Sequence, residues 1–253
     1  MINPLDLSGR TVLVTGASAG IGRGTAVLLS RLGARVVLVG RNAGRLEETS
    51  RSMEGFQHQV VPFDLTRLDE IPQWLSKVVD ETGPLHGLAH CAGISSLVPL
   101  RVMTIAHLDE IMRTNFYSAV VLTKEFARKR MHTPDSGVVL VASVAGMLAA
   151  PGRSAYSASK GALIAFAKSA AIELAKSGVR VNCVAPSYVQ TEMYEKAAEG
   201  LTPEQLTALV ESTQPLGLGT PLDVAQAIAY LIAGTSRWIT GAVLSVDGGY
   251  AAQ

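Results

Sequence analysis

Three side chains suited to proton transfer lie between residues 143 and 160. Tyr156 and Lys160 are four residues apart, so on a helix they share one face and the ammonium can lie beside the phenol. A neighbouring cation favours the phenolate, which lowers the tyrosine pKa from about 10 towards neutral pH. Such a phenol exchanges protons with an alcohol or carbonyl oxygen, to which Ser143 could donate a hydrogen bond. Tyrosine and lysine with this spacing also occur as a solvated pair on many helices. Whether the pair is catalytic therefore depends on the elements that surround it.

A glycine-rich turn near the N-terminus predicts a phosphate site. The apolar run 11–14 ends at Thr15-Gly-Ala-Ser-Ala-Gly-Ile-Gly22, and helical periodicity follows to Leu32. Glycines permit a tight turn and close approach to a pyrophosphate, whose charge is attracted by the N–H groups of the helix start. A glycine turn without a ligand is the alternative. We expect a dinucleotide to contact Gly16, Ser18, Ala19, Gly20, Ile21 and Gly22.

The residues after the second predicted strand, 35–39, bear on the choice of cofactor. Dinucleotide folds carry an acid here for a ribose 2′-hydroxyl and use a nearby arginine for a 2′-phosphate. This chain has Gly40-Arg41-Asn42, without an acid. We therefore predict NADP(H) as the preferred cofactor, contacted by Arg41 and Asn42, with NAD(H) as the alternative. Arg45, one turn later, could share this role, or Arg41 could simply face solvent.

Two further strand ends extend the predicted cofactor site. Strand 57–63 ends at Asp64, which either caps a helix starting near residue 67 or accepts a hydrogen bond from an adenine amino group. Strand 87–90 ends before a glycine that allows close approach of a ligand. His90 has no catalytic companions and is expected to be structural. The contacts predicted here are Asp64, Leu65, Ala92 and Gly93.

Asn115 lies within a long helical pattern, residues 104–131. Asparagine is a weak helix former, so it either breaks the helix locally and helps to hold a water, or faces solvent. The basic run 128–130 suits the helix C-terminus, and a surface for an acidic carrier is the alternative.

The rest of the chain continues the alternation of strands and helices. We predict a loop at 132–136, strands at 137–141, 180–185 and 241–246, and helices at 156–175 and 221–233. Regular alternation lapses at 187–214, which we interpret as a mobile substrate lid. No linker or repeat interrupts the pattern. The sequence predicts one doubly wound α/β domain of Rossmann type over residues 1–253, with a seven-stranded parallel sheet.

Composition limits the kinds of partner. Of 253 residues, 48% are hydrophobic and 17% charged, and the net charge is +1, so neither nucleic acid nor an anionic membrane is a predicted partner. The two cysteines lack metal-ligand spacing, and we expect no metal site. The N-terminus lacks the pattern of a signal peptide, and no apolar run is long enough to span a membrane, so we expect a cytoplasmic protein.

Taken in order, the glycine turn, Asp64, Ala92-Gly93, Asn115, Ser143 and Tyr156-x-x-x-Lys160 resemble the short-chain dehydrogenase/reductase superfamily over nearly the whole chain. The resemblance implies that Tyr156 is the general acid or base and that Ser143 polarises the substrate oxygen. Lys160 would lower the phenol pKa and bind the nicotinamide ribose, and Asn115 would hold a water of a proton relay. Contacts implied after the sixth strand are Pro186, Ser187, Val189 and Thr191.

The chain departs from the family pattern at three places. His90-Cys91 stands where two asparagines are usual, Ser187 replaces a glycine, and Ala19 occupies the position of a basic residue in many NADP-using relatives. The closest subgroup in appearance is the 3-oxoacyl-[acyl-carrier-protein] reductases of fatty acid biosynthesis, although Ile172 lies where an arginine often meets the carrier. The resemblance implies a homotetramer, with a homodimer as the alternative.

These observations leave three functional hypotheses. The first is an NADPH-dependent reductase of a 3-oxoacyl or similar β-keto substrate, free or bound to a carrier protein. The second is an NAD-dependent alcohol, polyol, sugar or steroid dehydrogenase. The third is a non-catalytic dinucleotide-binding protein, because a fold alone does not guarantee chemistry.

Overall fold

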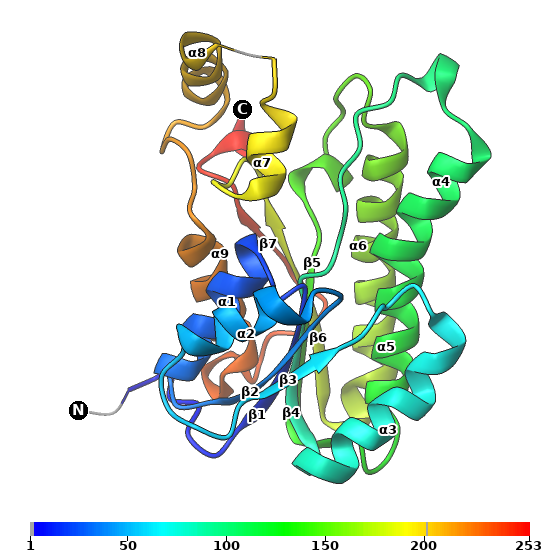
Figure 1. Cartoon of the computed structure of the whole chain (residues 1–253), viewed down its shortest axis with the longest axis vertical. Coiled ribbons are helices and arrows are strands. Elements are labelled where there is room, and N and C mark those ends of the chain that lie inside the picture. Colours follow the sequence, from blue (N-terminus) through cyan, green and yellow to red (C-terminus); the bar gives the residue numbers. More distant parts are fainter. Residues whose placement is uncertain (1–2, 201) are drawn as a thin grey trace.

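A computed structural model of the chain describes residues 3–200 and 202–253. Within them, seven parallel strands form one sheet in the order β3-β2-β1-β4-β5-β6-β7 (Figure 1). The strands are β1 (Thr11–Thr15), β2 (Arg35–Gly40), β3 (Gln59–Pro62), β4 (Leu85–His90), β5 (His132–Val141), β6 (Val179–Pro186) and β7 (Val243–Val246). The strand order reverses between β1 and β4, where such sheets bind ligands at their carboxyl ends. The predicted doubly wound sheet is confirmed.

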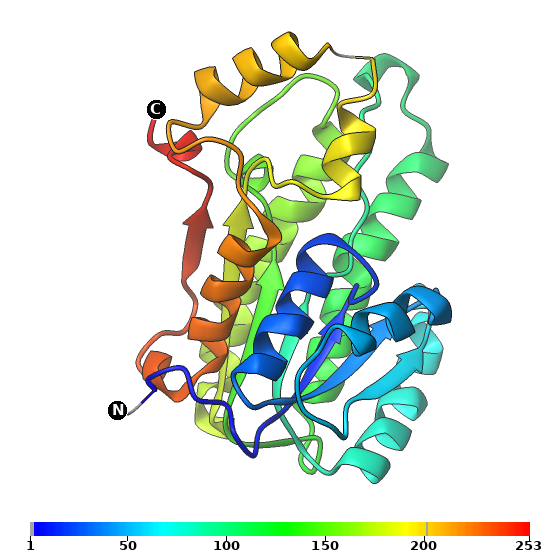
Figure 2. The same ribbon diagram turned by 60° about the vertical axis from the view of Figure 1, so that its left-hand side comes forward.

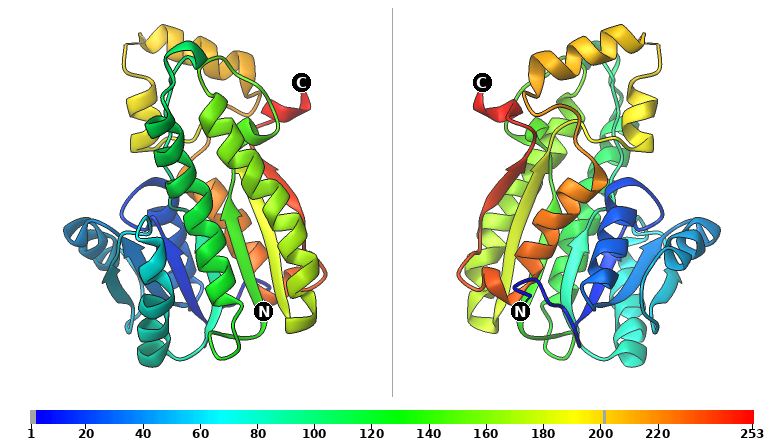
Figure 3. Two further views of the ribbon diagram at one scale, coloured as in Figure 1. Left: turned by 90° about the vertical axis from the view of Figure 1, so that its right-hand side faces the viewer. Right: turned by 90° about the vertical axis from the view of Figure 1, so that its left-hand side faces the viewer.

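Helices cover both faces of the sheet (Figure 3). One face carries α1 (Gly20–Arg31), α2 (Ala43–Arg51) and α9 (Pro221–Ile232), and the other α3 (Ile71–Thr82), α4 (Ile105–Met112), α5 (Ser118–Phe126) and α6 (Ser154–Leu174). Alternate residues of one strand enter different cores: Leu13 packs on the α3/α5/α6 side, and Val12 and Val14 pack on the α1/α9 side. The central strands are therefore apolar at consecutive positions, because both faces are buried.

Two short helices stand beyond the carboxyl ends of the strands (Figure 2). They are α7 (Glu192–Ala197) and α8 (Pro203–Thr213), which begin at the capping residues Thr191 and Thr202. The buried Gln214 anchors the end of this segment, because its side chain bonds the backbone N–H and carbonyl of Tyr188. The predicted lid, 187–214, is thus largely helical. Residue 201 lies outside the described residues, and the mobility of the lid stays a prediction.

Two predicted elements were wrong in detail. The predicted loop 132–136 belongs to β5, where Leu85 pairs with His132 and the register shifts before Gly87. This irregularity accommodates Pro134 and the positive φ of Asp135, residues that signal a loop in sequence. The predicted helix 104–131 is interrupted by a π-helical turn at Arg113–Tyr117 and ends at Phe126.

The basic run Arg128–Arg130 therefore follows a helix that has already ended, and Arg128 pairs with Glu125 at 2.8 Å. Because it precedes β5, it lies at the amino edge of the sheet, opposite the edge where the carboxyl ends of the strands meet. None of the described helices is sufficiently long and apolar to cross a bilayer.

Candidate active site

Ser143, Tyr156 and Lys160 line one cavity at the carboxyl edge of the sheet, which encloses about 1020 Å³ including its open mouth. Ser143 follows β5, and the other two lie on the first turns of α6. Asn115 lies beside Lys160 across Gly93. A Cβ atom added to Gly93 would lie 3.3 Å from Asn115 Oδ1 and 3.4 Å from Lys160 Nζ. The structure therefore brings together the four residues predicted to be catalytic.

Lys160 is a buried cation. Its Nζ atom donates a 2.8 Å hydrogen bond to the carbonyl of Val141 and lies 5.7 Å from the centre of the Tyr156 ring. Burial lowers the pKa of Lys160 from 10.5 to about 8, while Cys183 and Cys91 act in the opposite direction. The side chain thus remains largely protonated at neutral pH and can supply positive charge within the cavity.

Tyr156 differs from expectation in the direction of its pKa. Burial raises the pKa of Tyr156, whereas a hydrogen bond with Ser143 and then the charge of Arg153 lower it. The direction is therefore opposite to the predicted lowering. A low-dielectric site disfavours the phenolate, and the neighbouring charges only partly offset that effect. Tyr156 is accordingly a neutral phenol that can donate a proton.

The hydroxyl of Ser143 faces both the cavity and the end of β6. Its Oγ atom accepts from the N–H of Ala145 at 3.1 Å and lies 3.3 Å from the carbonyl of Pro186, to which it donates. Because the hydrogen bond to Pro186 is long, Ser143 can donate to a substrate oxygen instead without losing a strong hydrogen bond. Ser143 is therefore positioned to polarise such an oxygen.

Asn115 lies in the π-helical turn between α4 and α5 and is fully buried. Its side chain accepts from the N–H of Ile94 at 2.8 Å and donates to the carbonyl of Ile94 and to Ser159 Oγ, at 3.0 and 3.1 Å. The solvent-facing alternative is wrong, and the predicted break in the helix is confirmed. Such turns frequently mark functional sites. The water relay stays a prediction.

The residues of the glycine turn fit the diphosphate of a dinucleotide. At the start of α1, as at α3 and α6, the cap residue makes no side-chain hydrogen bond and the first turn carries no acid, whereas α2, α4, α7, α8 and α9 are capped by side chains. The N–H groups of this turn are thus left for an anion. A Cβ on Gly22 would lie 2.2 Å from the carbonyl of Gly16, so glycine is required for the turn to close.

The segment after β6 meets the glycine turn from the other side. A Cβ on Gly20 would lie 3.0 Å from Thr191, whose hydroxyl donates to the carbonyl of Val189 at 3.1 Å. Of the remaining predicted contacts, Pro186 and Ser187 line the cavity. The geometry is therefore compatible with all four residues contacting one dinucleotide.

Other predicted residues lie at neighbouring strand ends. Burial alone would raise the pKa of Asp64, but hydrogen bonds from Thr66 and the charges of Arg41 and Arg67 lower it overall. Its carboxylate caps a tight turn at Thr66 and not the following helix, which begins at residue 68. Leu65 is buried beneath this turn. The adenine contact stays a prediction.

His90 is confirmed as a structural residue. Its ring contacts Thr15 Oγ1 at 2.9 Å and Ser118 Oγ at 3.4 Å, and burial lowers its pKa to about 3. Thr15 in turn accepts from the N–H of Ala92 at 3.0 Å. A histidine in place of the usual asparagine therefore still ties β1 to β4 and α5.

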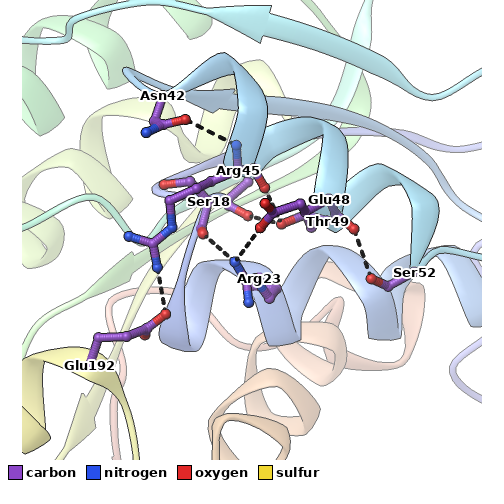
Figure 4. Close-up of polar contacts among 9 residues, drawn as sticks. Ser18, Arg23, Asn42, Arg45, Glu48, Thr49, Ser52 and Glu192 are labelled. Atoms are coloured by element: carbon purple, nitrogen blue, oxygen red, sulfur yellow. Dashed lines mark hydrogen bonds and ion pairs between the residues drawn. The ribbon is translucent and has the colours of Figure 1, made fainter.

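Charged residues gather where the adenosine 2′ position is expected (Figure 4). Arg41 is exposed, and the Asn42 side chain accepts from the N–H of Arg45 as the cap of α2. The Arg45 guanidinium pairs with Glu192 of α7 at 2.6 Å. Arg23, which sequence reasoning did not single out, donates to the carbonyl of Ser18 at 2.8 Å.

Sequence reasoning also missed the residues on the substrate side of the cavity. Tyr188, Tyr194 and Tyr250 form a cluster whose ring centres are 6.0 and 6.2 Å apart, and Arg153 lies over the Tyr188 ring. Together with Arg153 they come from three parts of the chain, residue 153, residues 188–194 and residue 250. Only the position of Arg153, three residues before Tyr156, was a signal available in the sequence.

Comparisons with known proteins agree with this geometry. A family model described as enoyl-(acyl carrier protein) reductase matches residues 16–251. The chain is 33% identical to a 3-oxoacyl-[acyl-carrier-protein] reductase of Rickettsia prowazekii, covering 97% of this chain and 98% of the relative. It is 35% identical to a cis-4-hydroxycyclohexanecarboxylate dehydrogenase of Sinomonas cyclohexanicum, covering 96% and 97%.

A solved structure of a dehydrogenase/reductase from Sinorhizobium meliloti superposes with a TM-score of 0.89 at 33% identity, covering 98% of this chain and 97% of that one. Sequence, fold and the arrangement of Ser143, Tyr156 and Lys160 thus agree. The chain belongs to the short-chain dehydrogenase/reductase superfamily of NAD(P)-dependent oxidoreductases.

Proposed function

We propose that this protein is an NADPH-dependent reductase that converts the carbonyl of a 3-oxoacyl or similar β-keto substrate to a secondary alcohol. The observation that carries the proposal is the single cavity in which Ser143, Tyr156 and Lys160 lie together. The cavity adjoins the glycine turn whose helix start is left open for an anion. The match to 3-oxoacyl-[acyl-carrier-protein] reductases supports the β-keto class.

In the proposed reaction, bound NADPH supplies the hydride to the carbonyl carbon. Ser143 and Tyr156 hydrogen-bond the carbonyl oxygen, which fixes its position and stabilises the negative charge that develops there. Tyr156 donates its proton to that oxygen, and its neutral form is favoured by burial. Lys160, still a cation at neutral pH, stabilises the phenolate that remains. Asn115 and a bound water complete the proton relay to solvent.

Two features support NADPH over NADH. An acid is missing at the end of β2, where Arg41 is exposed and near Asp64. Arg45 and Arg23 lie close by, so the region is rich in positive charge. A 2′-phosphate would gain charge-assisted hydrogen bonds from such groups, whereas a 2′-hydroxyl would not need them.

The second candidate function is the oxidation of an alcohol by NAD, on a polyol, sugar, steroid or hydroxy acid. It is favoured by the similarity to the cis-4-hydroxycyclohexanecarboxylate dehydrogenase and by the pairing of Arg45 with Glu192, which occupies one of the candidate phosphate ligands. A non-catalytic role has no such support, since the chain belongs to an oxidoreductase family and keeps the acid–base residues together.

We further propose a cytoplasmic homotetramer with a small-molecule substrate. Exposed apolar side chains on α6 and before β7, Ile172 and Trp238, support an interface between copies. A carrier-bound substrate has less support, because Arg128–Arg130 lies at the edge of the sheet away from the cavity.

A substrate screen tests the proposal. Purified protein is mixed with NADPH or NADH and with β-ketoacyl thioesters, cyclic ketones, sugars or steroid ketones, and separately with NADP⁺ or NAD⁺ and the corresponding alcohols. The change in absorbance of the reduced nicotinamide is followed. We expect NADPH-dependent reduction of β-keto substrates. A marked preference for NADH, or activity only towards alcohols with NAD, would favour the second candidate.

A further inference from the structure

A positive charge lines the substrate side of the cavity. Arg153 is the residue before the first turn of α6, three positions ahead of Tyr156, and its side chain is half-buried. It shares the cavity wall with Tyr156, and its guanidinium carbon lies 6.0 Å from the centre of the Tyr188 ring. The guanidinium thus lies in the same cavity as the reacting phenol and is partly shielded from solvent.

Among the described residues, no acidic side chain neutralises this charge. Within residues 3–200 and 202–253, Arg153 forms no ion pair and its guanidinium donates no hydrogen bond, whereas Arg23, Arg45 and Arg128 each pair with a glutamate. The described cavity lining contains neither Asp nor Glu. A partly buried guanidinium that faces an apolar cavity without a counterion is available to bind an anion there.

Other features of the pocket also suit an anion. No side chain caps the N-terminus of α6, so the helix dipole adds positive potential beside Arg153. Tyr188, Tyr194 and Tyr250 surround the same space with phenol groups, which can donate hydrogen bonds. The contact of Arg153 with the face of the Tyr188 ring leaves the N–H donors of the guanidinium free, and their planar arrangement matches a carboxylate.

We propose that Arg153 binds a carboxylate on the substrate itself, so that the preferred substrate is a small oxo acid. The proposal rests on the proposed function and narrows its substrate class from thioesters to free acids. Arg153 and Tyr156 line the same cavity, so a carboxylate and a carbonyl bound by them belong to one small molecule. The phosphate of a pantetheine arm lies many bonds from its thioester and does not fit this arrangement.

The chemistry is unchanged by this assignment. The carbonyl carbon gains a hydride, and with it two electrons, from NADPH, which becomes NADP⁺. The carbonyl oxygen gains a proton from Tyr156, so that a hydroxy acid forms. The carboxylate stays ionised and serves only to orient the molecule, with Arg153 as a specificity-determining residue.

Matched substrate pairs test the proposal: 4-oxopentanoate and 4-oxocyclohexanecarboxylate, each against its methyl ester, with cyclohexanone and a 3-oxoacyl thioester as neutral carbonyls. The variants are Arg153→Gln, Arg153→Lys and, as a control, Arg101→Gln, which changes an exposed arginine outside the cavity. For the parent we expect kcat/KM to be about tenfold or more higher for each acid than for its ester.

Arg153→Gln should remove this preference, mainly by raising the KM for the acid, and should leave kcat/KM for the esters within about twofold of the parent. Arg153→Lys should restore part of the preference for the acid. Equal use of acid and ester by the parent, preference for the thioester, or equal losses on both members of a pair in Arg153→Gln would overturn the assignment. Reduction of neutral ketones alone would support the proposed carbonyl reduction and overturn the proposal that Arg153 binds a substrate carboxylate. Failure to reduce any of these carbonyls with either cofactor would reject both.

Discussion

The burial of Lys160 has an energetic cost that can be measured. The side chain is 4% exposed, and burial lowers its pKa from 10.5 to about 8. Between these values the unfolded state binds more protons than the folded state, so the stability of the protein rises with pH. At about 1.4 kcal/mol for each pH unit, the charge destabilises the fold by about 3 kcal/mol at pH 7. This loss is recovered as the pH rises from about 8 to 10.5.

Lys160→Met removes the charge and keeps a side chain of similar length. The variant loses the hydrogen bond to Val141, worth about 1 kcal/mol, so we expect it to be about 2 kcal/mol more stable than the parent at pH 7. This advantage should vanish or reverse near pH 10.5, where the parent lysine is largely neutral. Urea unfolding of both proteins, followed by circular dichroism at pH 7 and near pH 10, measures the difference while other titrating groups cancel.

A difference in stability that is the same at both pH values would refute this reasoning. It would mean that Lys160 retains an ordinary pKa in the folded protein. The expected gain in stability accompanies a loss of carbonyl reduction, because the variant cannot stabilise the phenolate of Tyr156. Stability and activity should therefore change in opposite directions, as they do where a functional site holds a buried charge.

Three further predictions concern Asn115 and the two sides of the expected cofactor phosphate site. Asn115→Ala should lower the free energy of unfolding by about 1–3 kcal/mol in urea titrations, because the N–H and carbonyl of Ile94 lose their partner; an unchanged midpoint would contradict this. Arg41→Ala should raise the KM for NADPH about tenfold or more and leave that for NADH nearly unchanged. Glu192→Gln should lower the KM for NADPH by a few fold, since it frees Arg45 from an exposed ion pair. Steady-state kinetics with both cofactors checks the last two, and equal effects on NADH would argue against a phosphate site.

The fold followed from the sequence because its signals are local and repeated. Continuous apolar runs such as residues 36–39 and 138–141 mark strands that are buried on both faces, and glycines mark the turns between them. The strand ends then place Ser143, Tyr156 and Lys160 at one edge. Their order along the chain was sufficient to predict that they meet.

What the sequence left open or predicted wrongly depends on contacts between distant segments. The interruption at Asn115 is stabilised by Ile94 and Ser159, and nothing local fixes it as a π-helical turn. The direction of the Tyr156 pKa depends on burial, which spacing alone does not reveal. The pocket cluster of Tyr188, Tyr194 and Tyr250 joins loops whose geometry no periodicity describes.

The most direct test of the proposed mechanism is single-turnover reduction by Tyr156→Phe compared with the parent, on the best substrate of the screen. The variant keeps the ring that fills the site and lacks only the hydroxyl, so cofactor binding and the unfolding midpoint should change little. We predict that the rate of NADPH oxidation falls by about 10²–10⁴. A folded Tyr156→Phe variant that reduces the carbonyl within a few fold of the parent rate would contradict the assignment of Tyr156 as the proton donor.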